Sequence, residues 1–103
     1  MSYTIRLENK RGSPLAKVDG PTEAFNRSVA GLNPSTFPWL STLDPYGSTT
    51  FNRLQIPHVI GELRLLRTQV ADLDAQTLIE RTLQLAGRAI AEEPHLYLRF
   101  YGD

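Results

Sequence analysis

The stretch His95-Leu-Tyr-Leu-Arg-Phe-Tyr101 decides the fold, because it alternates apolar and polar side chains along its length. Its even-numbered residues are apolar and its odd-numbered residues are His, Tyr, Arg and Tyr, which is the two-residue period of a β-strand. Residues 2–8 alternate in the same way, with the apolar side chains at the odd positions. We predict that these two strands pair and that the C-terminal strand lies in the centre of a sheet.

The residues after the first strand predict a hairpin and a short helix. Asn9 to Gly12 supply a turn, and residues 15–18 form a short returning strand. Residues 22–32 predict a short helix that Thr22 caps and Gly31 ends.

Two longer helices occupy the second half of the chain. Apolar residues from Val59 to Val70 follow a narrow stripe with helical spacing, which predicts a regular helix over residues 57–71. A second helix is expected to start near Asp74, which would cap it, and to end before Pro94. Its wide apolar arc indicates contact with both the sheet and the first helix. The short link between the two helices allows only an antiparallel helical hairpin.

The pattern as a whole predicts a single α+β domain over residues 1–103, with a small, mainly antiparallel sheet and a helical hairpin packed on one face. The residues that occupy the apolar stripes should form its core. They are Leu63, Leu66, Leu78, Leu83, Leu96, Leu98 and Phe100.

The segment 37–53 has an unusual composition, with the only Trp of the chain and three further aromatic residues. Asp44-Pro-Tyr-Gly47 is typical of a type I turn, and it is expected to join strands at 39–43 and 49–51. Asn52 and Gln55 resemble a capping box, which predicts an irregular turn before the first long helix.

Composition and charge exclude several classes of function. The chain has 11 basic and 11 acidic residues, so no net charge attracts it to nucleic acid or to an anionic membrane. It contains no Cys, and we expect a cytoplasmic protein without a membrane-spanning segment or a signal peptide.

Catalytic motifs are absent from the sequence. No Gly-x-Ser-x-Gly elbow, glycine-rich phosphate loop or zinc-ligand spacing occurs, so we expect no enzyme activity, metal or cofactor. His58 and Glu62 lie one helical turn apart, but that spacing is commoner in exposed side-chain pairs. The alternative hypothesis is a small enzyme whose active site comprises Asp44, Asn52, Arg53 and His58.

Aromatic and arginine side chains favour a protein-binding function, because Tyr, Trp and Arg are enriched at the energetic centres of interfaces. The predicted partner-binding residues are Trp39, Tyr46, Arg53, Tyr97, Arg99 and Tyr101. A second flank of His58, Glu62, Leu65 and Gln69 is expected to be exposed on the first long helix. A homodimer is an open alternative to a complex with another protein.

Residues 37–63, from Phe37-Pro-Trp-Leu40 through Asp44-Pro-Tyr-Gly47 to Glu62-Leu63, resemble a family of small bacterial proteins with no assigned function. The resemblance implies no activity and no catalytic residues. Small bacterial α+β proteins of this size include immunity proteins, antitoxins and inhibitors, which suggests by analogy a non-catalytic binding module. An immunity-type inhibitor or a subunit of a complex is the expected function.

Overall fold

The computed structural model describes residues 3–20, 22–92 and 95–102. In this part of the chain four strands form one antiparallel sheet of order β2-β1-β4-β3, and helices pack against it. The elements are β1 (Thr4–Glu8), β2 (Pro14–Lys17), α1 (Glu23–Val29), the 3₁₀ helix η1 (Leu40–Thr42), β3 (Ser48–Phe51), α2 (Ile56–Gln69), α3 (Leu73–Ala91) and β4 (Tyr97–Tyr101). The predicted α+β fold is confirmed.

The central position of the C-terminal strand is also confirmed, because β4 pairs with β1 on one side and with β3 on the other. The register sets Leu98 opposite Leu7 and Phe100 opposite Ile5, so the apolar faces of both strands coincide. The prediction that this strand begins at His95 is wrong, because the strand begins at Tyr97. His95 has a φ of 67°, a left-handed conformation that cannot continue a strand.

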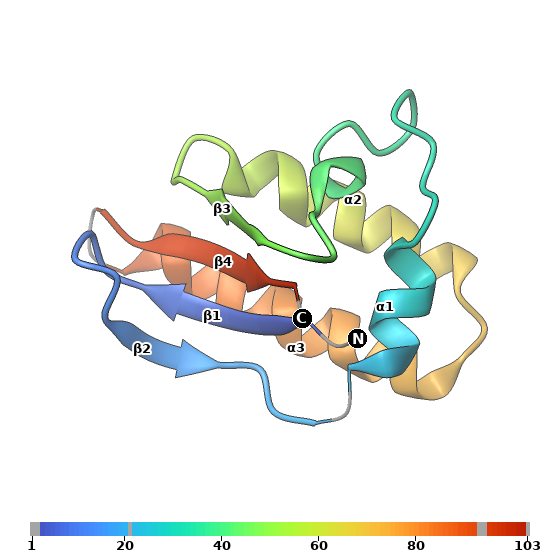
Figure 1. Ribbon diagram of the computed structural model, residues 1–103, viewed down its shortest axis with the longest axis horizontal. Coiled ribbons are helices and arrows are strands. Elements are labelled where there is room, and N and C mark those ends of the chain that lie inside the picture. The colour runs from blue at the N-terminus through green and yellow to red at the C-terminus, as the bar shows by residue number, and fades with distance from the viewer. Residues whose placement is uncertain (1–2, 21, 93–94, 103) are drawn as a thin grey trace.

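α3 lies behind β1 and β4 in the view of Figure 1, and α1 lies beyond one end of these strands. α3 packs against β1 and β4 on one side and against α2 on the other, as its wide apolar arc predicts, and α1 also packs on α3. The predicted start of α3 near Asp74 is confirmed, since the helix begins at Leu73, but Asp74 is not its capping residue. Asp72 is the capping residue, because its carboxylate accepts hydrogen bonds from the Asp74 and Ala75 amides. None of the described helices is long and apolar enough to cross a bilayer.

The start of α2 follows the predicted capping box. Asn52 Oδ1 accepts hydrogen bonds from the amides of Leu54 and Gln55, while Gln55 Oε1 accepts one from the Asn52 amide. The helix then begins at Ile56, and Pro57 lies in its first turn, where the missing N–H costs no hydrogen bond.

The core contains the predicted side chains. Phe100 lies at its centre, with its ring in contact with the rings of Tyr3, Phe25 and Phe51. Of the seven predicted core residues all are buried except Leu83, which is half-buried and packs against the core. The apolar arc of α3 is therefore wider than the surface that its neighbours cover.

The predicted strand at residues 39–43 and the predicted exposure of Glu62 on α2 are both wrong. Residues 40–42 form a 3₁₀ helix and not a strand, because the Glu62 carboxylate accepts hydrogen bonds from the Trp39 and Leu40 amides at 2.9–3.1 Å. These amides are held as the N-terminal donors of a helix and cannot join a sheet. Glu62 itself is buried against this turn and does not belong to an exposed flank of α2.

The edges of the sheet are short. β2 and β3 have four residues each, and the pairing of β1 with β2 shifts register between Leu7 and Glu8. Pro14 opens β2. Short edge strands, bulges and proline all oppose the addition of a further strand.

Candidate interaction surface on the open face of the sheet

The face of the sheet opposite the helices carries the polar side chains of the alternating strands. Arg6 pairs with Arg99 on β4 and with Lys17 on β2, so these three side chains share one face. Tyr97 and Tyr101 flank Arg99 on the same side of β4. We call this set the basic aromatic face: Arg6, Lys17, Tyr97, Arg99 and Tyr101.

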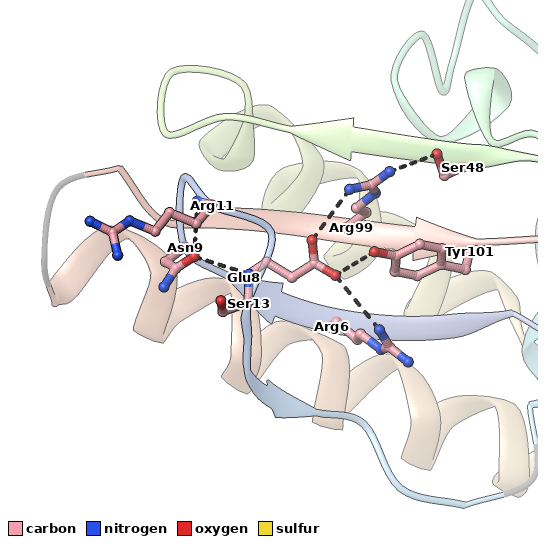
Figure 2. A network of polar contacts seen from close by, with 8 residues as sticks. All are labelled: Arg6, Glu8, Asn9, Arg11, Ser13, Ser48, Arg99 and Tyr101. Atoms are coloured by element: carbon pink, nitrogen blue, oxygen red, sulfur yellow. Dashed lines mark hydrogen bonds and ion pairs between the residues drawn. The ribbon is translucent and has the colours of Figure 1, made fainter.

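A buried carboxylate lies at the centre of this face (Figure 2). The Glu8 side chain is only 2% exposed, although it points away from the core. Its Oε2 accepts a hydrogen bond of 2.5 Å from the Tyr101 hydroxyl, and its Oε1 lies 3.4 Å from Arg99 Nη1. Arg6 Nη1 lies 4.0 Å from Oε2. The burial of this charge is compensated by two guanidinium groups and one phenol.

The Tyr101 ring lies between the two arginines in the view of Figure 2. The guanidinium carbon of Arg6 is 4.9 Å from the ring centroid and that of Arg99 is 4.7 Å from it, both within cation–π range. The hydrogen bond to Glu8, followed by desolvation and the charge of Glu8, raises the pKa of Tyr101. Tyr101 is therefore held neutral, as a hydrogen-bond donor, in a fixed orientation.

Arg99 connects this cluster to the edge strand β3. Its Nη2 donates a hydrogen bond of 3.2 Å to the Ser48 hydroxyl, so each terminal nitrogen of the guanidinium has a partner. The Arg99 Nε is buried and has no hydrogen-bond partner among the described residues. An unpaired buried donor costs free energy, and a ligand or a water that reaches it would recover part of that cost.

The charges of the basic aromatic face do not cancel. Arg6, Lys17 and Arg99 carry three positive charges, and the buried Glu8 supplies one negative charge among the outward residues of the four strands. The neutral chain thus concentrates a local excess of two positive charges on one face. Such a patch favours an anionic surface.

A hollow adjoins the Tyr97 end of the face. It has a volume of about 350 Å³, and Arg53, Leu54 and Tyr97 are among its lining residues. Leu54 is 82% exposed. Arg53 and Tyr97, two predicted partner-binding residues that are far apart in the sequence, thus line the same hollow. Leu54 adds an exposed apolar side chain to it.

Trp39 and Tyr46 are also predicted to bind a partner, but neither lines this hollow. Trp39 belongs to the helical layer, because its amide bonds to Glu62 and its ring stacks on His58 with centroids 5.5 Å apart. Tyr46 is 78% exposed in the turn before β3, at the end of the sheet where Gly47 pairs with Gly102. Trp39 is thus separated from the basic aromatic face, while Tyr46 lies beyond its Tyr101 end.

The four residues of the alternative active site do not converge. Asp44 precedes β3 and accepts a hydrogen bond from the Tyr46 amide, whereas Asn52 follows β3 and caps α2. A four-residue strand of roughly 13 Å separates the two. Arg53 Nη2 donates to the Ile90 carbonyl oxygen, and His58 stacks on Trp39. The Asp44 and Asn52 side chains thus hold the turn and the start of α2 respectively.

A metal site on α2 has no support in the described residues. The Glu62 carboxylate binds two backbone amides, so it is already engaged beside His58. No group of three or more potential metal ligands occurs in the part of the chain that the structure describes.

Sequence analysis missed Arg6, Glu8, Lys17 and Ser48 as members of the surface. The alternation of residues 2–8 did put Arg6 and Glu8 on the polar side of the first strand. Arg6 and Glu8 contact Arg99 and Tyr101 because of the register of β1 against β4. The alternation alone does not distinguish between registers that differ by two residues.

No family model, curated protein sequence or solved structure matches this chain in the three comparisons. The resemblance of residues 37–63 to small bacterial proteins therefore stays a prediction. The geometry of the basic aromatic face is therefore the basis on which function is inferred.

Proposed function

We propose that this protein is a non-catalytic binding module that recognises the acidic surface of another protein through its basic aromatic face. The observation that carries the proposal is the ordered stack of Arg6, Tyr101 and Arg99 over the buried Glu8 carboxylate. Arginine and tyrosine side chains that are already fixed lose little conformational entropy when they bind, which favours affinity.

The charge and shape of the face support a protein ligand over RNA. Sheet modules that bind RNA stack bases on open aromatic rings. The Tyr101 ring already contacts two guanidinium groups, which leaves Tyr97 as the half-buried ring of the face for stacking. An excess of two positive charges is also small beside the basic patches of nucleic-acid-binding domains.

The same charges argue for a different protein as the partner and against a symmetric dimer through this face. Two copies that met face to face would bring like charges together, which costs free energy unless counter-charges intervene. An acidic partner gains from the same arrangement. An immunity-type inhibitor or a complex subunit of the cytoplasm fits this mode of action, and the absence of Cys agrees with a reducing compartment.

The proposal is tested with two surface variants and one matched control. Tyr97→Ala/Arg99→Ala removes two members of the face, and Arg6→Glu reverses one charge of it. Arg64→Glu reverses an exposed charge on α2, on the helical side of the molecule. Circular dichroism first establishes that each variant folds. Partners captured by the wild-type protein are identified by mass spectrometry, purified and titrated against all four proteins.

Binding to a true partner should weaken at least about 30-fold in the Tyr97/Arg99 variant, the loss expected for an interface hot spot. Arg6→Glu should weaken it and reduce its dependence on salt, while Arg64→Glu should leave it unchanged. Equal binding by the face variants and the control overturns the assignment of this face. Preferential capture of RNA, or turnover of a small molecule by the purified protein, overturns the proposed class of function.

A further inference from the structure

A pocket lies at the end of the molecule where α1 and the turn before β3 approach each other. Its volume is about 420 Å³, within the range of small-molecule sites. Apolar side chains from two separate segments form much of its wall, namely Val29, Leu32, Leu43 and Pro45. It shares no lining residue with the basic aromatic face, so an inference from it is independent of the proposed function.

The Tyr3 side chain provides a polar group within this apolar wall. Tyr3 is 7% exposed and lines the pocket, and its hydroxyl has no hydrogen-bond partner among the described residues. Burial, followed by the negative charge of Asp44, raises the pKa of Tyr3. Pro45 and Gly102 line the same pocket as Tyr3.

Tyr3 is held in this position from several sides. Its amide donates a hydrogen bond of 3.1 Å to Asn26 Oδ1, and its ring packs edge-on against Phe25 and Phe100. The hydroxyl cannot turn away easily to find another acceptor. A protonated phenol fixed in an apolar pocket can donate a hydrogen bond to an acceptor group of a bound ligand.

The charges around the pocket select against an anion. Asp44 precedes Pro45 of the pocket wall, and its negative charge contributes to the raised pKa of Tyr3, so an anionic group in the pocket would meet both this charge and the apolar wall. Arg27 lines the pocket, but its Nη2 is 3.6 Å from Asp72 Oδ2 and its side chain is largely exposed. A salt-bridged, solvated guanidinium gives a buried anion little compensation.

We propose that this pocket binds a small, uncharged and mostly apolar molecule with one hydrogen-bond acceptor, to which the Tyr3 hydroxyl donates. The apolar wall and the unbonded hydroxyl of the buried Tyr3 indicate this class of ligand. Shape and apolar contact supply the affinity, and the Tyr3 donor selects for the acceptor.

Two probes of similar shape test the proposal. Acetophenone carries a carbonyl acceptor, and isopropylbenzene replaces that group with a branched hydrocarbon. Each is titrated into the isotope-labelled protein and followed by amide chemical shifts. We expect both to shift the amides of Ala30, Gly31 and Gly102, which line the pocket, with dissociation constants on the order of 1 mM for ligands of this size.

The variant Tyr3→Phe isolates the hydrogen bond. It should weaken acetophenone binding about fivefold and leave isopropylbenzene binding unchanged, because only the first ligand accepts from the hydroxyl. Benzoate should bind at least about tenfold more weakly than acetophenone, because its charge must be desolvated. Ala30→Trp, which introduces a large ring at the pocket wall, should abolish the shifts caused by both probes.

Several outcomes would overturn the inference. If neither probe shifts the pocket amides at concentrations up to its solubility limit, then the pocket is not a binding site for this class of ligand. Equal weakening of both probes by Tyr3→Phe would remove the role of the hydroxyl, and tighter binding of benzoate would contradict the uncharged ligand. Shifts that stay in the Ala30→Trp variant, with its strand resonances at wild-type positions, would show that the probes bind elsewhere.

Discussion

The Tyr101 hydroxyl donates a 2.5 Å hydrogen bond to Glu8 Oε2 across 93 positions of the sequence. This contact joins the first strand to the last on the face of the sheet that the helices leave open (Figure 2). The Glu8 side chain is buried although it lies on that face, and Arg6 and Arg99 both lie within ion-pair distance of it. The carboxylate thus orients the three side chains from which we infer binding.

Replacement of Glu8 should be costly for a residue on the solvent side of a sheet. Glu8→Ala leaves the Tyr101 hydroxyl and Arg99 Nη1 without their acceptor, and it leaves two arginines close together. We expect the free energy of unfolding to fall by about 2–3 kcal/mol, as for a largely buried polar group that loses its partners. Urea denaturation followed by circular dichroism measures this loss.

A matched control distinguishes burial from ion pairing as such. Glu80 lies 2.6 Å from Arg67 Nη2, but both side chains are about half exposed. Glu80→Ala should cost under about 1 kcal/mol, because water screens a surface pair. A loss for Glu80→Ala as large as that for Glu8→Ala would contradict the view that Glu8 is a buried anchor.

Alkaline pH should destabilise the protein through two tyrosines. The pKa values of Tyr101 and Tyr3 are raised above their ordinary value of 10.0, by the Glu8 hydrogen bond and by burial respectively. Below pH 10 both states keep these protons. As pH rises above it the unfolded chain loses them first, so the native state binds more protons and the free energy of unfolding decreases.

Urea unfolding at several pH values between about 8 and 11 measures this slope. Tyr101→Phe should reduce the decrease, and the Tyr101→Phe/Tyr3→Phe double variant should reduce it further. Tyrosinate absorbance should show correspondingly less ionisation at the alkaline end of the titration in the variants. A wild-type stability that rises with pH across this interval would refute the raised pKa values.

Two leucines of the predicted core should differ in their contribution to stability. Leu98 is fully buried on β4, whereas Leu83 on α3 is half-buried at the edge of the core. Leu98→Ala should lower the free energy of unfolding by about 2–5 kcal/mol, and Leu83→Ala by clearly less, because its neighbours leave part of it in water. Thermal and urea denaturation of both variants test the order, and a larger loss for Leu83→Ala would reverse it.

Much of the fold follows from local patterns. The alternation of residues 95–101 and the stripes of the two helices each fix which side chains face the core, and burial of one face then fixes the layers. The segment 39–43 escaped prediction because its conformation depends on Glu62, a carboxylate about 20 residues away that binds its amides. A long-range polar contact leaves no periodic signal.

The candidate surface was only partly predictable for the same reason. The polar positions of β4 were visible in the sequence, but the pairing that brings Arg6 and Glu8 beside them depends on strand register. The sequence also grouped Asp44 with Asn52 because they lie eight positions apart, while β3 holds them at opposite ends of a strand. Proximity in sequence is a poor guide to a site when a strand intervenes.

The Glu62 contact gives the last prediction. Its Oε1 accepts the Leu40 amide at 2.9 Å, and both of its oxygens accept the Trp39 amide. Glu62→Ala removes the acceptor from two amides at the start of η1 and should lower the free energy of unfolding by about 1–3 kcal/mol. Because Trp39 is the only Trp and stacks on His58, its fluorescence should report the loosening of this turn directly.

Glu62→Gln keeps one side-chain oxygen that can accept from both amides, so it should retain most of the stability and the Trp39 emission of the wild-type protein. Gln69→Ala, at an exposed position near the end of the same helix, controls for a change of helix propensity. If Glu62→Ala and Gln69→Ala cost the same and neither alters the Trp39 emission, then the carboxylate does not hold the 3₁₀ turn. A selective loss in Glu62→Ala, with recovery in Glu62→Gln, means that one buried acceptor on α2 determines the conformation of the segment before β3.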